Sequence, residues 1–373
     1  MNGIDNALTR IRGSAKEKSP TVRVLAAATS HHDCPTAMLG LATNTDFDGM
    51  CAGTPYESPF GQDPQAFRRG EMFERRVKSP NYGEFLRLLR EQANFSVESA
   101  RIVNLREEAP RNKTGLGMRA NRTRQLLRSI ARNTIDAPNL IDGAVLSVRI
   151  GGRVAYFEAD GIAAASGGLI HVAEIKSFPL TDNQCDFEKL GAAMDQAAWY
   201  ALLVRRTLRD LGFSGDEVSS TGFIILPLGL GLNPTLLKQV LTQRIARAER
   251  VLETASNAGA PAEELPPVVF PGPDDKDPIA AIENILDTVG NVYRPECLAN
   301  CGLSRLCRER AQDLGSPSLC GSQVQQQLPE IRSFHRAAEL ARGAKPALVE
   351  AQAALALAQA SRLYERVIAS GQL

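Results

Sequence analysis

Two acidic residues and a lysine near the middle of the chain have the types and spacing of a divalent-metal site. Asp160 ends the stretch YFEAD, and Glu174 and Lys176 belong to the stretch AEIKS. Hydrolysis of a phosphodiester at neutral pH uses a hard cation to polarise the phosphate and activate water, and Mg²⁺ or Mn²⁺ takes carboxylate oxygens as ligands. On a strand, Glu174 and Lys176 would project from one face, with the carbonyl of Ile175 as a further ligand. The lysine would position the attacking water.

The surrounding sequence predicts the elements that must position these residues. It predicts, in order, strands at 140–150, 154–162 and 169–178, a helix at 187–211 and a buried strand at 221–228. Gly151-Gly152 is typical of a hairpin turn, so the first three strands are expected to form a meander in which Asp160 and Glu174 meet. An earlier helix is expected at 64–77. The fold class is therefore α/β.

With these elements in place, the chain resembles the RecB-like branch of the PD-(D/E)xK nucleases. The resemblance includes the helix motif Gln-x-x-x-Tyr, present as Gln196 and Tyr200, which share a helical face. It implies a restriction-endonuclease-like core, a mixed central sheet flanked by helices, in which Gln196 and Tyr200 contact the substrate strand. The family adds a ligand from an early helix after a glycine, which implies Glu74 here and Glu71 as second choice. Asp142 and Glu158 are taken as structural or spare.

Three cysteines in the C-terminal third of the chain are spaced as metal ligands. Eleven residues contain all three, which are Cys297, Cys301 and Cys307. An iron-sulfur cluster or a zinc ion is usually held by four ligands, so a fourth ligand must come from elsewhere in the chain. The spacing does not distinguish these two metals. Cys320 would complete a local zinc site, and Cys185 is expected to be an idle thiol.

The resemblance implies a 4Fe-4S cluster, because CRISPR-associated RecB-like nucleases and the AddB nuclease domain hold one with a cysteine before the core and three after it. Cys51 is preferred as the upstream ligand and Cys34 is the alternative. Three residues separate Cys297 from Cys301, whereas the family usually has two residues between the first two of its C-terminal cysteines.

Composition limits the classes of protein to which the chain could belong. The formal net charge is +1, so a nucleic-acid surface must come from local clustering, and residues 101–132 carry nine basic residues against two acids. This segment is either a solvated helical face or a surface that follows phosphates. No apolar run approaches the roughly 20 residues of a membrane span, and the first twenty residues lack the apolar segment of a signal peptide. We expect a cytoplasmic protein without a membrane partner.

The expected organisation has five parts. They are an N-terminal arm at 1–50, a nuclease core at 51–256 with a basic helical insertion near 101–135, a linker at 257–278, a cysteine segment at 279–325 and C-terminal helices at 326–373.

The expected function is Mg²⁺- or Mn²⁺-dependent hydrolysis of DNA, as an exonuclease on single strands or ends, in DNA processing or anti-phage defence. One alternative is a nuclease subunit that is active only with a helicase or with other repair or defence subunits. Another is a non-catalytic nucleic-acid-binding scaffold.

Overall fold

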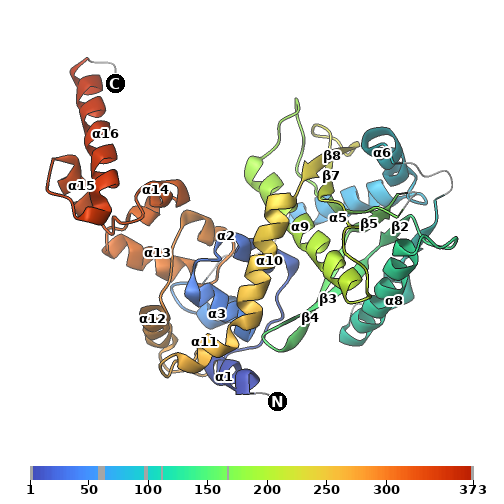
Figure 1. Ribbon diagram of the computed structural model, residues 1–373, viewed down its shortest axis with the longest axis horizontal. Coiled ribbons are helices and arrows are strands. Elements are labelled where there is room, and N and C mark those ends of the chain that lie inside the picture. Colours follow the sequence, from blue (N-terminus) through green and yellow to red (C-terminus); the bar gives the residue numbers. More distant parts are fainter. Residues whose placement is uncertain (1–2, 58–63, 96–99, 111, 166–167, 371–373) are drawn as a thin grey trace.

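A six-stranded mixed sheet lies on one side of the molecule in the computed structural model, which describes residues 3–57, 64–95, 100–110, 112–165 and 168–370 (Figure 1). The strand order is β1-β2-β5-β6-β7-β8, with β1–β2 and β6–β7 parallel and the other neighbours antiparallel. The sheet strands are β1 (Ile102–Asn104), β2 (Leu140–Asp142), β5 (Gly161–Ala164), β6 (Ile170–Ile175), β7 (Thr221–Pro227) and β8 (Pro234–Val240). The predicted α/β class is confirmed.

Helices surround this sheet and form most of the rest of the molecule. The α-helices of the N-terminal half are α1 (Gly3–Arg12), α2 (Val22–Ser30), α3 (Pro35–Thr43), α4 (Phe47–Cys51), α5 (Pro64–Lys78), α6 (Gly83–Ala93), α7 (Leu105–Glu108) and α8 (Lys113–Ala131). Those of the C-terminal half are α9 (Phe187–Arg209), α10 (Thr242–Asn257), α11 (Gly259–Glu264), α12 (Pro278–Val289), α13 (Ser304–Asp313), α14 (Ser322–Gln327), α15 (Phe334–Ala341) and α16 (Ala351–Ala369). Short 3-10 helices are η1 (Pro295–Ala299), η2 (Pro317–Cys320) and η3 (Leu348–Glu350).

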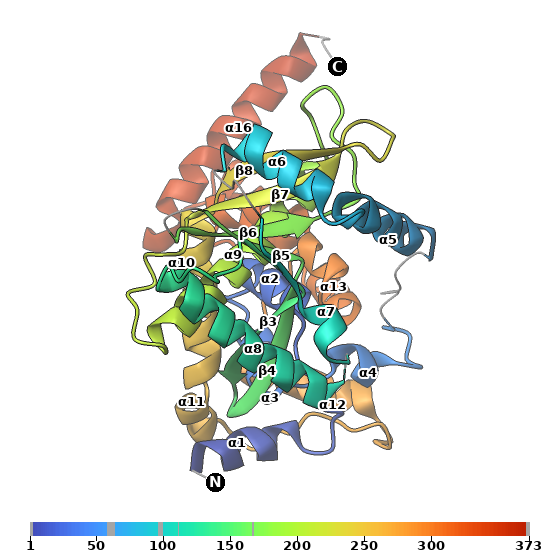
Figure 2. The same ribbon diagram turned by 90° about the vertical axis from the view of Figure 1, so that its right-hand side faces the viewer.

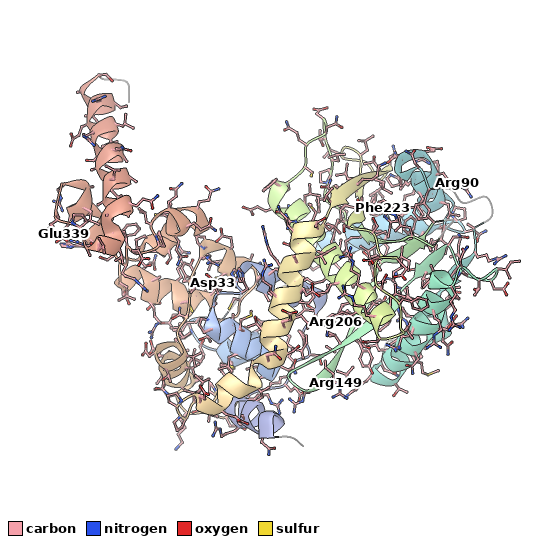
Figure 3. All side chains as sticks on the ribbon, in the orientation of Figure 1. Asp33, Arg90, Arg149, Arg206, Phe223 and Glu339 are labelled. Carbon is pink, nitrogen blue, oxygen red and sulfur yellow. The ribbon has the colours of Figure 1, made fainter. Side chains whose placement is uncertain are left out.

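The two faces of the sheet are covered by different helices. Phe223 and Ile225 of β7 belong to a core cluster that includes buried residues of α5 and α6. Ile224 and Leu226 belong to the cluster that contains Trp199 and much of α9. Successive side chains of a strand point to opposite faces, so the continuous apolar run of β7 is explained by helices on both sides. Figure 3 shows Phe223 within this part of the molecule.

The predicted three-stranded meander is wrong in detail, because two of its strands break and change sheets. The first predicted strand breaks at Gly143 (φ +63) into β2 and β3 (Ala144–Ile150), and the second breaks at Asp160 into β4 (Arg153–Ala159) and β5. β3 and β4 pair only with each other, whereas β2, β5 and β6 join the main sheet. A glycine allows the positive φ that redirects the chain. Asp160 consequently lies at the junction between the two sheets.

The tip of the β3–β4 hairpin is a close contact that only glycine permits. Ile150 pairs with Arg153 across the predicted Gly151-Gly152 turn, and both glycines have positive φ. A Cβ atom on Gly151 would lie 1.6 Å from the carbonyl oxygen of Ala42, at the C-terminal end of α3. The turn is therefore fitted against the N-terminal helices.

Replacing Gly151 by Ala is expected to lower the free energy of unfolding by about 2–5 kcal/mol, from left-handed strain and overpacking together. Gly212 is the matched control, since it has φ +88 but nothing within 4 Å of an added Cβ. Gly212→Ala should cost only about 1–2 kcal/mol. Urea denaturation of both variants measures the difference, and equal losses would show that the turn does not press on α3.

The N-terminal residues expected as an arm are folded into the body of the protein. Leu8 and Ile11 of α1 are buried in the same cluster as Cys51, Phe270 and Ile282, because α1 is amphipathic and its apolar face needs cover. Phe270, in the segment expected as a linker, donates its backbone N–H to the carbonyl of Ile11 at 2.8 Å. The N-terminal helix is thus packed against the segment that contains α11 and Phe270, and Figure 2 shows α1 beside α11.

A second connection joins α2 and α3 to the cysteine segment. Arg294 donates from Nη1 to Asp33 Oδ1 at 2.9 Å, and Asp33 is labelled at this junction in Figure 3. Beyond it, α15 and α16 form a hairpin with a small core of its own and project from the body (Figure 1). Among the described helices, none is both long and apolar enough to span a membrane.

Candidate active site

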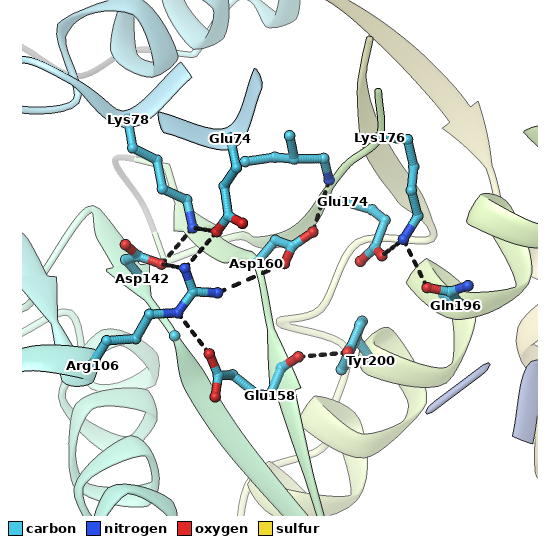
Figure 4. Close-up of polar contacts among 12 residues, drawn as sticks. Glu74, Lys78, Arg106, Asp142, Glu158, Asp160, Glu174, Lys176, Gln196 and Tyr200 are labelled. Carbon is cyan, nitrogen blue, oxygen red and sulfur yellow. Dashed lines mark hydrogen bonds and ion pairs between the residues drawn. The ribbon is translucent and has the colours of Figure 1, made fainter. Parts of the chain in front are cut away.

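Strand pairing places Asp160 next to Glu174. Gly161 of β5 pairs with Ala173 of β6, so the residue before Gly161 lies opposite the residue after Ala173. Asp160 is also bonded to the end of β6, because the N–H of Ile175 donates to Asp160 Oδ2 at 3.0 Å (Figure 4). Burial raises the pKa of Asp160, while the charges of Lys176 and Lys78 oppose this shift.

Glu174 is a buried carboxylate with one oxygen left unpaired. Its Oε1 lies 2.6 Å from Lys176 Nζ, but Oε2 is buried and lacks a hydrogen-bond partner among the described residues. Burial raises the pKa of Glu174 to about 7, and the charge of Asp160 adds to this shift while Lys176 opposes it. A buried, unpaired acceptor oxygen costs stability. The donor set and this oxygen therefore fit a hard divalent cation.

Lys176 is held in place by the helix behind the sheet. Its ammonium group donates to Gln196 Oε1 at 3.0 Å, in addition to its ion pair with Glu174. Burial would lower the pKa of Lys176, but the charges of Glu174 and Asp160 raise it, so the amine stays protonated without a metal. The backbone N–H of Ile175 donates to Asp160, and the backbone carbonyl of Ile175 remains a proposed metal ligand.

The polar groups of Gln196 and Tyr200 have partners inside the protein. Tyr200 is only 4% exposed, and its hydroxyl donates to the backbone carbonyl of Glu158 at 2.5 Å. Gln196 is similarly buried and accepts from Lys176. The two side chains expected to contact the substrate strand hold β4 and the lysine in position.

Glu74 reaches the same site from α5. Its Oε1 accepts from Lys78 Nζ at 2.6 Å and from Arg106 Nη1 at 2.5 Å. Burial would raise the pKa of Glu74, but these two cations lower it to about 2, so the carboxylate is ionised. Glu71, the second choice, is exposed to solvent.

Asp142 and Glu158, expected to be structural or spare, form part of one ionic network with Glu74. Asp142 accepts from Lys78 at 2.7 Å and from the Tyr82 hydroxyl at 2.6 Å. Glu158 lies 3.1 Å from Nη2 of the buried Arg119 and accepts from Arg106. Figure 4 shows most of this network beside Asp160 and Glu174.

A second feature is a small cavity whose wall includes four cysteines. The cavity measures about 30 Å³ and lies between the α2–α3 connection and the cysteine segment. The four are Cys34, Cys297, Cys301 and Cys307. Cys34 is the N-cap residue of α3, immediately before Pro35. The structure thus favours Cys34, the alternative, over Cys51 as the upstream partner of the three.

The remaining cysteines lie elsewhere. Cys51 is fully buried in the same core cluster as Cys297 and Cys307, but it is not part of the cavity wall. Cys320 is exposed, and Cys185 is half-buried beside α9.

The cavity thiols are in an environment that disfavours their ionisation. Burial raises the pKa of Cys297 to about 11 and that of Cys307 to about 12, and it raises that of Cys301 well above its usual value. The charge of Cys34 contributes to the raised pKa of all three. A bound metal deprotonates coordinating thiols outright, so four such groups around one cavity fit a metal cluster chemically. Over the part of the chain that is described, no three His, Cys, Asp or Glu side chains are arranged as ligands of a single ion.

Comparison with known proteins identifies no family. No protein-family model matches the sequence, and no curated protein does. A solved structure titled "Crystal structure of SSO0001" aligns with 12% identity over 53% of this chain and 90% of that one, with a TM-score of 0.18. A score this low supports no conclusion about fold or function.

Several residues of the site were not expected from the sequence. Lys78 follows Glu74 by four residues on α5, a spacing that would have indicated an ion pair. Arg106 and Arg119 belong to the basic stretch, and in the structure both reach the site, with Arg119 buried and Arg106 half-buried. Arg23 of α2 lies close enough to Lys176 for its positive charge to act against the raised pKa of the lysine. No sequence pattern connects these two positions.

Proposed function

We propose that this protein is a divalent-metal-dependent deoxyribonuclease with a RecB-like, restriction-endonuclease-like core. The observation that carries the proposal is Glu174, a buried carboxylate with an unpaired oxygen beside Asp160 and Lys176. A buried acceptor oxygen without a partner costs stability, and coordination of a hard divalent cation would supply that partner. The adjoining sheet supports the proposal, since Asp160 directly precedes β5, and Glu174 and Lys176 lie at the neighbouring end of β6.

Each residue has a defined role in this proposal. Asp160, Glu174 and Glu74 hold Mg²⁺ or Mn²⁺, with the carbonyl of Ile175 as a further ligand. When bound, the ion polarises the phosphate and favours ionisation of the attacking water. Lys176, fixed by Gln196, positions that water and neutralises charge on the phosphate.

The second metal site is proposed to be a 4Fe-4S cluster on Cys34, Cys297, Cys301 and Cys307, with zinc as the alternative. Its support is the shared cavity and the chemistry of its four thiols, of which three are buried and that of Cys301 is half-buried. Because the four come from both ends of the chain, a cluster there would clamp the N-terminal helices to the C-terminal segment.

Cleavage of end-labelled single-stranded DNA by the anaerobically purified chain tests the proposed activity. We expect cleavage with Mn²⁺ or Mg²⁺ and none with excess chelator, because the carboxylates need the ion to act on a phosphate. Product sizes over time separate exonuclease from endonuclease action. Metal binding without cleavage would overturn activity of the chain alone and point to a subunit of a larger helicase-nuclease or defence complex. DNA binding without metal binding would point to a scaffold.

A further inference from the structure

Arg106 lies across the candidate active site, at the point where β1 passes into α7. Its Nε donates to Glu158 Oε1 at 2.6 Å and its Nη1 to Glu74 Oε1 at 2.5 Å. Nη2 lies 3.8 Å from Asp160 Oδ1. A single guanidinium therefore faces two of the proposed metal ligands, which come from different elements (Figure 4).

The acids that Arg106 touches do not depend on it alone for a partner. Glu74 also pairs with Lys78, and Asp160 also accepts from the backbone of Ile175. Glu158 also faces Arg119 at 3.1 Å. The side chain of Arg106 is 32% exposed, so a ligand from solvent can reach it. Its position thus combines access with contact to the ligand oxygens, which a purely structural ion pair does not require.

We propose that Arg106 occupies the cation position of the metal-free site and becomes a phosphate-binding catalytic residue when the metal enters. This inference rests on the proposed nuclease function. A divalent ion and a guanidinium repel each other at such short range, so both cannot share Glu74 and Asp160. Glu158 anchors Nε, and the two Nη groups turn from the carboxylates to the scissile phosphate. A guanidinium suits this role, because it can donate two parallel hydrogen bonds to a phosphate.

Two substitutions of Arg106 separate its two roles. Arg106→Gln removes the competing charge, so Mn²⁺ should bind about tenfold tighter by isothermal titration calorimetry. The same variant should cleave single-stranded DNA about 10²-fold more slowly at saturating Mn²⁺, because the phosphate loses a charged donor. Arg106→Lys keeps the charge without the paired donors, so its metal affinity should stay near that of the unsubstituted protein while its cleavage still falls more than about tenfold.

Arg87→Gln is the matched control, since Arg87 pairs with Glu84 and Glu91 on α6, outside the site. It should change neither measurement. Unchanged or weaker Mn²⁺ binding by Arg106→Gln would overturn the placeholder role, and undiminished cleavage by both variants would overturn the phosphate contact. If Arg106→Gln fails to fold, Arg106→Lys still tests the phosphate contact. The proposed function fails separately, in the unsubstituted protein, if that protein neither binds Mn²⁺ nor cleaves DNA.

Discussion

Replacing Glu174 by Gln is expected to reduce the cleavage of single-stranded DNA by at least about 10³-fold at saturating Mn²⁺. The change removes a charged ligand oxygen from the centre of the proposed metal site, and metal stabilisation of the transition state is worth several kcal/mol. A loss of about 4 kcal/mol corresponds to that factor. Mn²⁺ binding measured by calorimetry should weaken as well. The glutamine side chain is neutral, and the position of Oε2 is then taken either by the amide nitrogen or by an uncharged oxygen.

A second substitution distinguishes loss of a ligand from loss of an ion pair. Glu174→Asp keeps a negative charge near Lys176 but withdraws the carboxylate by one methylene, so cleavage should again fall sharply. Glu91→Gln is the control, since Glu91 is an exposed acid on α6. Circular dichroism should show that all three variants are folded. Cleavage by Glu174→Gln within threefold of the unsubstituted protein would rule out the assigned site.

Replacing Cys34 by Ala is expected to abolish the iron content of the anaerobically purified protein, from about four irons per chain to near zero. Cys34 lines the cavity with the three C-terminal cysteines, and a cluster that loses one of four thiolate ligands is poorly retained. Cys51→Ala is the matched control, because Cys51 is an equally buried thiol that lies outside the cavity wall. It should keep its iron and its visible absorption.

Metal analysis of both variants decides the assignment. Iron retained by Cys34→Ala and lost from Cys51→Ala would show that Cys51 is the fourth ligand. Zinc in place of iron, lost with the same cysteine, would replace the cluster by the alternative metal and keep the site. The midpoint temperature of thermal unfolding should fall in Cys34→Ala, because the clamp between the N-terminal helices and the cysteine segment is lost.

Residue patterns over a few neighbouring positions were sufficient to predict several elements in the middle of the chain. The alternation of Glu174, Ile175 and Lys176 and the length of α9 depend only on backbone geometry over a few neighbouring residues. The turn at Gly151-Gly152 is local in the same sense. The pattern at 154–162 does not predict the break at Asp160, because a run of strand-forming residues has the same pattern whether or not it passes from one sheet to another.

By itself, the sequence determined which residues could be catalytic or metal-binding, and it placed Glu174 on a strand and Gln196 and Tyr200 on a helix. Only the tertiary structure decided which of them meet. It brings Arg106 to Glu74 and Asp160, and it places Cys34 rather than Cys51 with cysteines more than two hundred residues away. Periodicity follows from the dihedral angles of adjacent residues, whereas contacts between distant segments follow from how helices and sheets pack, which no short pattern encodes.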